Sequence, residues 1–257
     1  MRLSFHNSAT VAGPERLLDA NGAWRWRNYP VRYGVLDHPK LGLVLLDTGY
    51  EADLFSNENW RVRVYRNLLR PKLLPLGDAA QVVQNMGAKA EDVRHIILTH
   101  LHADHMCGLS RFPNARLYMS AASLQVWRGE LKCHGFFSQL MPTVNSREIC
   151  VIDDKAQHKL PWAEFGFDVL GDGSALAVPL PGHMIGHLGV YFPTLAQPIF
   201  HAADADWTLQ SLFSDQPATR VAQVISDDAG DFARSKALVR RAAGYAQISL
   251  CHDDSAG

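Results

Sequence analysis

Two hydrophobic runs in the first fifth of the chain flank a turn and predict a β-hairpin. The stretch VRYGVLDHPKLGLVLLDTG, residues 31–49, places these runs on either side of DHPK, a tetrapeptide rich in turn-forming residues. The second run, from Leu43 to Leu46, is apolar at every position, as is typical of a strand buried on both faces. We therefore expect two neighbouring strands, the second ending at Asp47-Thr48-Gly49.

Capping signals and further apolar runs predict the elements that follow. DAAQVVQNMG, residues 78–87, starts with an Asp cap and ends in Gly, so it predicts a short helix, and a strand is expected at residues 93–98. Later segments with the same kinds of signal are a strand at 115–120, a helix at 121–130, strand-like runs within 175–193 and 197–207, and a helix followed by a strand within 231–254.

Two segments without clean periodicity interrupt this series, and both are predicted to be insertions. Residues 51–75 mix Trp60, Tyr65 and several arginines and are expected to be irregular or helical. Residues 131–146 are expected to be irregular. The order of the other elements favours two sheets with helices outside them over a doubly wound parallel sheet. The prediction is an α+β fold in one domain, residues 1–257.

Composition restricts the classes of partner and the compartment. The formal net charge is −1, so no broad attraction to nucleic acid or to an anionic membrane is expected. The N-terminal stretch lacks the apolar core of a signal peptide, and no apolar run reaches the roughly 18–20 residues of a membrane span. The four cysteines have no CxxC spacing, which disfavours a disulfide framework and favours a reducing cytoplasm.

The segment ILTHLHADHMCG, residues 97–108, carries the strongest chemical signal. His100 and His102 alternate around one residue, so an extended backbone points both imidazoles to the same side. Asp104 and His105 follow, where the chain turns and a helix could begin. Imidazole and carboxylate together suit zinc or a similar cation. Four such side chains in one short segment exceed what one open catalytic zinc takes, so the segment predicts two metal ions.

Further ligands are expected from later strand ends. His183, Asp204 and His252 each stand just past an apolar segment, where loops carry functional residues. His187 and His201 are interpreted as structural, and His134, in the second insertion, is a candidate for substrate contact. Cys107 and Cys251, which adjoin the candidate ligand segments, are interpreted as buried thiols.

Together these residues resemble the metallo-β-lactamase superfamily of hydrolases. The resemblance rests on Asp47-Thr48-Gly49, the HxHxDH motif at 100–105, Pro-Gly-His ending at His183, Asp204 and His252. It implies a four-layer αββα sandwich with the metals at one edge. It also implies a ligand set: His100, His102 and His183 for one metal, Asp104, His105 and His252 for the second, and Asp204 bridging both. Asp47 would orient a ligand histidine or its loop.

The resemblance implies metal-assisted hydrolysis by a dinuclear zinc-bound hydroxide. Two cations about 3.5–4 Å apart lower the pKa of a bridging water towards neutrality and polarise a carbonyl or phosphoryl oxygen. Asp104 could also move a proton as the leaving group departs. Zinc is the default metal, with iron and manganese as alternatives.

Within the superfamily, the layout is similar to that of the N-acyl homoserine lactonases, where two insertions wall the pocket. Near 51–75 and 131–146 this chain has insertions of that kind, and apolar side chains in the second favour a small, partly apolar ester or lactone: Phe136, Phe137, Leu140 and Met141. One position departs from the lactonase pattern. Trp207 stands three residues beyond Asp204, where the lactonases have a tyrosine.

Two alternatives stay open. A thioester hydrolase of the glyoxalase II kind shares the ligands but usually has a helical extension after the last one, and here five residues follow His252. A non-catalytic regulatory module that binds metal is the second. The partner expected is a small-molecule substrate, with no nucleic acid and no membrane; a homodimer is an open alternative.

Overall fold

The computed structural model describes residues 1–20, 22–142, 149–216, 219 and 226–253. The chain forms two compact units, each assembled from three segments. The first unit comprises Met1–Ala12, Asn28–Tyr118 and Gly135–Cys150. The second comprises Gly13–Arg27, Met119–His134 and Val151–Gly257. The single domain expected from the sequence remains a prediction.

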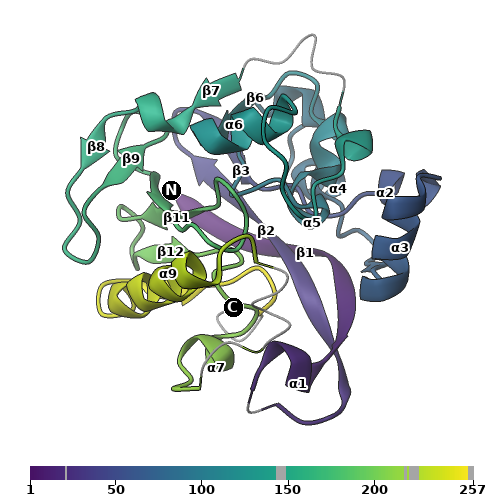
Figure 1. Cartoon of the computed structure of the whole chain (residues 1–257). Helices are drawn as coiled ribbons and strands as arrows, with labels where there is room; N and C mark the ends of the chain where they lie inside the picture. The colour runs from purple at the N-terminus through teal and green to yellow at the C-terminus, as the bar shows by residue number, and fades with distance from the viewer. Residues whose placement is uncertain (21, 143–148, 217–218, 220–225, 254–257) are drawn as a thin grey trace. The chain divides into compact units, whose positions relative to one another are not determined.

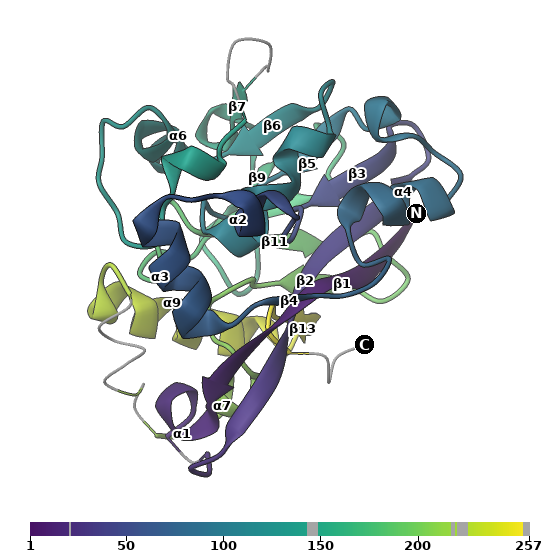
Figure 2. The same cartoon turned by 90° about the vertical axis from the view of Figure 1, so that its right-hand side faces the viewer.

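A seven-stranded sheet forms the centre of the first unit, with the strand order β4-β1-β2-β3-β5-β6-β7. Its strands are β1 (Arg2–Pro14), β2 (Trp26–His38), β3 (Gly42–Leu46), β4 (Lys72–Leu73), β5 (His95–Ile97), β6 (Arg116–Met119) and β7 (Ile149–Val151). The long strands β1 and β2 run side by side (Figure 2). The expected hairpin is confirmed, because β2 and β3 pair in antiparallel register from Gly34 opposite Leu46 to His38 opposite Gly42.

Three parallel strands in this sheet bring their carboxyl ends to one edge. Leu46 of β3 pairs with Ile97 of β5, and Ile97 pairs with Tyr118 of β6. Val44, Leu45 and Leu46 are buried, as the apolar run predicts. Because β3 and β5 end at the same level, the segment that starts at Asp47 and the segment that carries the HxHxDH motif start beside each other.

Short helices connect these strands. They are α2 (Asp53–Ser56), α3 (Trp60–Leu69), α4 (Ala79–Asn85), α5 (Ala103–Met106) and the 3-10 turns η1 (Ala90–Asp92), η2 (Cys107–Arg111) and η3 (Ser138–Leu140). The helix expected at 78–87 is confirmed, with the Asp78 side chain accepting from Gln81 N at 3.0 Å. The first insertion is mainly helical and ends in β4, a two-residue edge strand that the pattern did not predict. Residues 143–146 of the second insertion lie outside the described residues.

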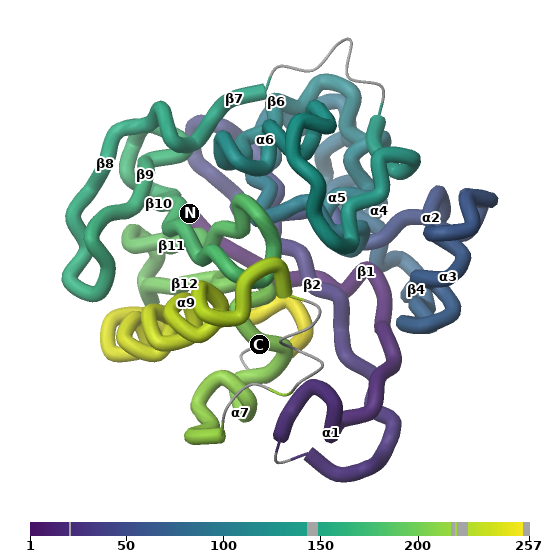
Figure 3. Tube along the Cα trace, viewed as in Figure 1, coloured from purple at the N-terminus to yellow at the C-terminus, as the bar shows by residue number. Residues whose placement is uncertain are grey.

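A six-stranded sheet forms the centre of the second unit, in the order β13-β12-β11-β10-β9-β8. Its strands are β8 (Gln157–His158), β9 (Gly166–Asp168), β10 (Leu176–Pro179), β11 (Leu188–Phe192), β12 (Ile199–His201) and β13 (Gln247–Ser249). From β8 to β12 the chain folds back and forth as an antiparallel meander (Figure 3). β13 then joins β12 in parallel, with His201 opposite Ser249. The loops that carry Asp204 and His252 therefore leave the same edge of this sheet.

Apolar packing holds helix α9 to this sheet (Figure 1). Among the described residues, the unit's helices are α1 (Glu15–Leu18), α6 (Ala121–Trp127), α7 (Leu209–Leu212), α9 (Ala229–Ala242) and the 3-10 turn η5 (Ile152–Asp154). Val239 and Ala242 of α9 are fully buried in one cluster with Phe200 of β12 and Ile248 of β13. Full burial of a Val or Phe side chain contributes about 1.5–3 kcal/mol, so this cluster fixes β12 and β13 beneath α9.

Two mixed sheets with helices confirm the expected α+β class. Among the described residues, no helix has both the length and the apolar character needed to cross a bilayer.

Candidate metal centre

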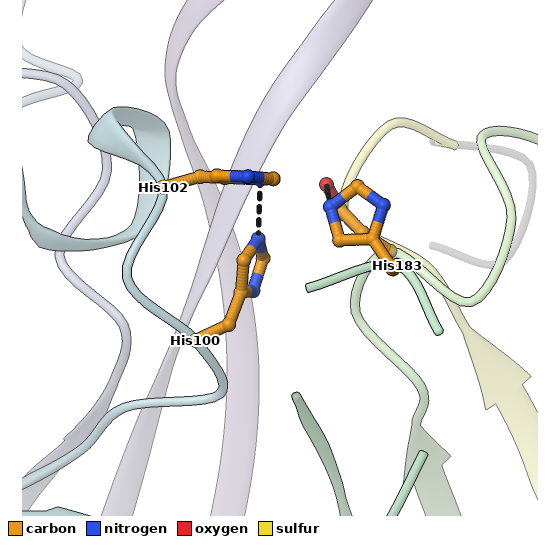
Figure 4. A group of neighbouring side chains, drawn as sticks. His100, His102 and His183 are labelled. Carbon is orange, nitrogen blue, oxygen red and sulfur yellow. Dashed lines mark hydrogen bonds and ion pairs between the residues drawn. The ribbon is translucent and has the colours of Figure 1, made fainter. Parts of the chain in front are cut away.

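The HxHxDH segment leaves the end of β5 and turns into α5, and its histidine rings meet. Leu101, between His100 and His102, is fully buried, so the two histidines point away from the core side that Leu101 occupies. His100 Nε2 lies 3.0 Å from His102 Nδ1 (Figure 4). The two rings stand nearly perpendicular, at 78°, with centroids 4.6 Å apart. Two imidazole nitrogens of the first unit therefore converge on one place.

Asp104 and His105 form a second pair in the first turn of α5. His105 Nε2 lies 3.8 Å from Asp104 Oδ2. The other ring nitrogen, His105 Nδ1, donates to Asp47 Oδ2 at 2.7 Å. An ionised carboxylate can only accept, so Asp47 places the ring proton on Nδ1 and leaves the lone pair on Nε2, as a metal-ligating histidine requires.

The Asp47 loop is bound to the motif at several points. Asp47 accepts from Thr99 N and from Thr99 Oγ1, each at 2.8 Å. Thr48 N and Thr48 Oγ1 both donate to His105 O, at 2.8 and 3.0 Å. Asp47 itself has a φ of 60°, an uncommon backbone conformation that tends to occur at functional sites. Sequence reasoning missed Thr99, although it directly precedes His100.

In the second unit, one carboxylate oxygen lies near two imidazoles. Asp204 Oδ2 is 3.3 Å from His183 Nε2 and 3.5 Å from His252 Nε2. All three side chains are buried. Asp204 follows β12 and His252 follows β13, so the parallel pairing of these strands brings the two together.

Close packing against the start of α9 determines the path of the His183 loop. Gly182 has a φ of 117°, and a Cβ added to it would lie 2.0 Å from Phe232 N, so only glycine fits there. Asp227 holds the same loop, because its Oδ2 accepts from Ile185 N at 2.7 Å and its N–H donates to His183 O at 3.4 Å. No local pattern in the sequence identifies Asp227, since its contacts are about 40 residues away.

His187 connects the end of β10 to Asp204. Its Nδ1 donates to Leu180 O at 2.7 Å, and its Nε2 accepts from Asp204 N at 3.3 Å. A ring that donates from one nitrogen and accepts at the other is the neutral form. The structural interpretation of His187 thus holds, and its contact reaches Asp204 itself. His201, also interpreted as structural, is buried in β12 with its Nδ1 3.2 Å from Ser249 Oγ.

Trp207 lies flat against His252. The ring centroids are 4.2 Å apart and the planes are inclined by 23°. The backbone N–H of Trp207 donates to Asp206 Oδ1 at 2.8 Å, and Asp206 forms a buried ion pair with Lys236 of α9. Burial raises the pKa of the Asp206 carboxyl, and the Lys236 ammonium opposes this shift. The loop beyond Asp204 is therefore anchored to α9.

His134 and Cys107 belong to none of the donor groups, whereas Cys251 Sγ lies within 4.8 Å of Asp204 and of His252. The His134 side chain is 79% exposed and pairs with Asp227 at 3.1 Å. Cys107 and Cys251 are buried thiols that form no disulfide, as expected. Burial raises the pKa of the Cys107 thiol to about 12, so it is protonated at neutral pH.

The donor spacing in each unit fits a shared cation. Zinc binds His nitrogen and carboxylate oxygen at about 2.0–2.2 Å, so two ligands of one tetrahedral ion lie about 3.3–3.6 Å apart. The pairs His100–His102, His183–Asp204, His252–Asp204 and His105–Asp104 are separated by 3.0, 3.3, 3.5 and 3.8 Å. Imidazole and carboxylate at these spacings match the donor set of a divalent metal.

The chain is similar in sequence to known hydrolases. A probable metallo-hydrolase of Mycobacterium tuberculosis is 32% identical over 169 residues, which cover 64% of this chain and 53% of that protein. The chain thus spans about half the length of this relative. The N-acyl homoserine lactonase AttM of Rhizobium johnstonii is 24% identical over 188 residues, 70% of this chain and 66% of that protein.

Solved structures share the fold over almost the whole chain. An N-acyl homoserine lactone hydrolase with the product N-hexanoyl-L-homoserine at its catalytic metal centre has a TM-score of 0.72 at 17% identity. The superposition covers 98% of this chain and 93% of that one. Residues 29–205 match the family described as the metallo-beta-lactamase superfamily. The chain therefore belongs to the metallo-beta-lactamase superfamily and has its fold.

Proposed function

We propose that this protein is a metal-dependent hydrolase that opens small lactones or esters, in the manner of the N-acyl homoserine lactonases. Its seven proposed metal ligands, for two divalent ions with zinc as the default, are His100, His102, Asp104, His105, His183, Asp204 and His252. The observation that carries the proposal is the position of Asp204 Oδ2, within 3.5 Å of ring nitrogens from both His183 and His252. A carboxylate so placed suits a bridge between two cations.

We assign each ligand the role that the resemblance to the superfamily implies. His100, His102 and His183 hold one ion, Asp104, His105 and His252 hold the other, and Asp204 serves both. Two such ions, when bound, supply a water of lowered pKa and polarise the substrate carbonyl. Asp47 keeps the His105 lone pair on Nε2 through its 2.7 Å hydrogen bond.

Asp104 is the proposed proton carrier. Hydrolysis of a lactone or ester adds water to the carbonyl carbon and breaks the C–O bond, so the departing alkoxide must gain a proton. Asp104 is buried in the first turn of α5 and has a second carboxylate oxygen that can hold that proton and deliver it.

The two insertions support a partly apolar substrate. In the first unit they contact each other: the Tyr65 and Phe137 rings are 5.1 Å apart, and Asn57 Nδ2 donates to Gln139 O at 3.3 Å. The second insertion also reaches the motif, since a Cβ added to Gly135 would lie 2.6 Å from His102 Nε2. Phe136 and Phe137 directly follow Gly135 in the chain, and a pocket wall of this apolar character would favour an acyl group over a charged one.

Metal analysis combined with a hydrolysis panel tests the proposal. Purified protein should contain close to two metal equivalents, lose activity with chelator and regain it with zinc. The panel contains N-hexanoyl homoserine lactone, other lactones, aryl esters, thioesters, a γ-lactam and phosphodiesters, and the lactones or esters should be turned over best.

Each other outcome contradicts a separate part of the proposal. One metal equivalent or none after supplementation excludes the dinuclear site. Turnover confined to thioesters favours the glyoxalase II alternative. Two bound metals without turnover of any class favour a non-catalytic module.

A further inference from the structure

The first insertion gathers exposed hydrophobic side chains. Five large ones are exposed within it, and a sixth, Leu76, directly follows it: Phe55, Trp60, Val64, Leu68, Leu73 and Leu76. Trp60 is 67% exposed, Leu68 68% and Leu76 70%. Scattered single hydrophobic residues on a surface need no explanation, but a contiguous group on one segment marks an interaction surface.

Helix α3 is apolar on two opposite faces. Trp60, Val64 and Leu68 follow each other at intervals of four residues, so they form one stripe along the helix, which we call the α3 stripe. Val62, on the other side, is fully buried and attaches the helix to the first unit. The packed face accounts for the fold of α3, whereas the α3 stripe has no role in it.

Arginines border the α3 stripe on both sides. At about 100° per residue, Arg61 stands on one flank of the stripe and Arg63 on the other. Both are exposed, and the Arg61 guanidinium lies 5.8 Å from the centre of the Trp60 ring. The ten residues of α3 include no acidic side chain. Arg66 is different, because its guanidinium bonds to the backbone carbonyls of Leu54 and Phe55.

We propose that α3 binds an anionic lipid surface. The α3 stripe would enter the boundary between headgroups and acyl chains, and Arg61 and Arg63 would reach the lipid phosphates while their stems follow the apolar surface. The exposed Arg70 and Lys72 just beyond the helix add positive charge to the same segment. A second copy docked through the same face would oppose arginines to arginines, which disfavours self-association there.

Net charge does not argue against this partner. The value of −1 averages the whole chain, whereas a surface charge is felt only within a Debye length, about 8–10 Å at ordinary ionic strength. The expectation of no membrane partner rested on that average and on the lack of an apolar run of membrane-spanning length, and neither describes a local surface. The proposal uses none of the proposed metal ligands, so its test does not depend on the metal centre.

Vesicle sedimentation with the full chain is the direct test. The protein is mixed with phosphatidylcholine vesicles, or with vesicles of equal phosphatidylcholine and phosphatidylglycerol, at about 0.1 M salt. We expect binding to the anionic vesicles only, with most of it lost in high salt. Each of Arg61→Gln and Arg63→Gln should weaken binding about five-fold. The double variant Trp60→Ser/Leu68→Ser should weaken it at least about ten-fold.

Two control variants distinguish binding through the α3 stripe from nonspecific adsorption to vesicles. Trp24→Ser and Arg94→Gln remove an exposed tryptophan and an exposed arginine elsewhere and should bind like the wild type. Circular dichroism and metal content of all variants should be unchanged. Equal binding to neutral vesicles, or an equal loss in Trp24→Ser, overturns the proposal. So does a dimer by light scattering that Trp60→Ser/Leu68→Ser makes monomeric, because that assigns the α3 stripe to self-association.

Discussion

His105 Nδ1 donates a hydrogen bond of 2.7 Å to Asp47 Oδ2, and both side chains are fully buried. This contact joins the segments after β3 and β5, and it keeps the lone pair of His105 on Nε2. Asp47→Asn preserves the shape but removes the anionic acceptor. Metal affinity and kcat/KM should each fall about 10–100-fold, the usual effect of losing a carboxylate that orients a ligand histidine.

Chelator competition and steady-state kinetics measure the Asp47→Asn effect. Asp37→Asn, at an exposed strand position, is the matched control and should behave like the wild type. Equal metal affinity in the two variants would remove Asp47 from the site.

Asp204→Asn removes the negative charge that would lie between two dications while keeping nearly the same volume. Metal content and hydrolysis rate should fall together, by at least about ten-fold. Elemental analysis and rates on the best substrate measure both, with the exposed Asp215→Asn as control. Unchanged metal content and rate would show that Asp204 is only a loop carboxylate.

His187→Phe keeps a buried ring but deletes the bonds to Leu180 O and Asp204 N. Two buried backbone groups lose their partner, so the free energy of unfolding should fall by about 2 kcal/mol. Metal affinity should fall as well, because Asp204 loses its backbone anchor. Denaturant titration and chelator competition separate the two effects.

The second buried histidine provides the comparison for His187. His201→Phe should lower stability with little change in metal affinity, since the bond of His201 goes to Ser249. The same loss of metal affinity in both variants would mean that the effect is general destabilisation.

Trp207 predicts weak activity on unsubstituted N-acyl homoserine lactones. It stacks on His252 and offers an indole N–H but no hydroxyl. In the lactonase pattern this position is a tyrosine, whose hydroxyl would be one electrophilic donor to the substrate carbonyl. Loss of one such donor costs about 3 kcal/mol of transition-state stabilisation, by analogy with the deletion of an oxyanion-hole group. Trp207→Tyr should therefore raise kcat/KM on these lactones, with another ester or lactone as the better wild-type substrate. A wild-type value of about 10⁴ M⁻¹s⁻¹ or above would refute this prediction.

Local sequence was sufficient to predict the main elements. The hairpin at 31–49, the capped helix at 78–87 and the helix followed by a strand near the C-terminus all form as expected. Their signals are short-range: an apolar run, an Asp cap, a terminal Gly. The edge strand β4 was missed because two residues carry no alternation, and its pairing with Ala9 and Thr10 of β1 is a long-range choice.

Sequence also predicted the chemistry of the candidate site, since the HxHxDH spacing and the positions of His183, Asp204 and His252 after apolar runs are visible without coordinates. Tertiary structure decided which groups support these side chains. Asp47 meets His105 because β3 and β5 are parallel neighbours, and Asp204 meets His252 because β12 and β13 are. Strand pairing joins residues about 50 positions apart, and no local pattern encodes which strands become neighbours. The exposure of the α3 stripe could not be predicted from the sequence either, because an apolar repeat on a helix does not indicate whether that face is packed or solvent-exposed.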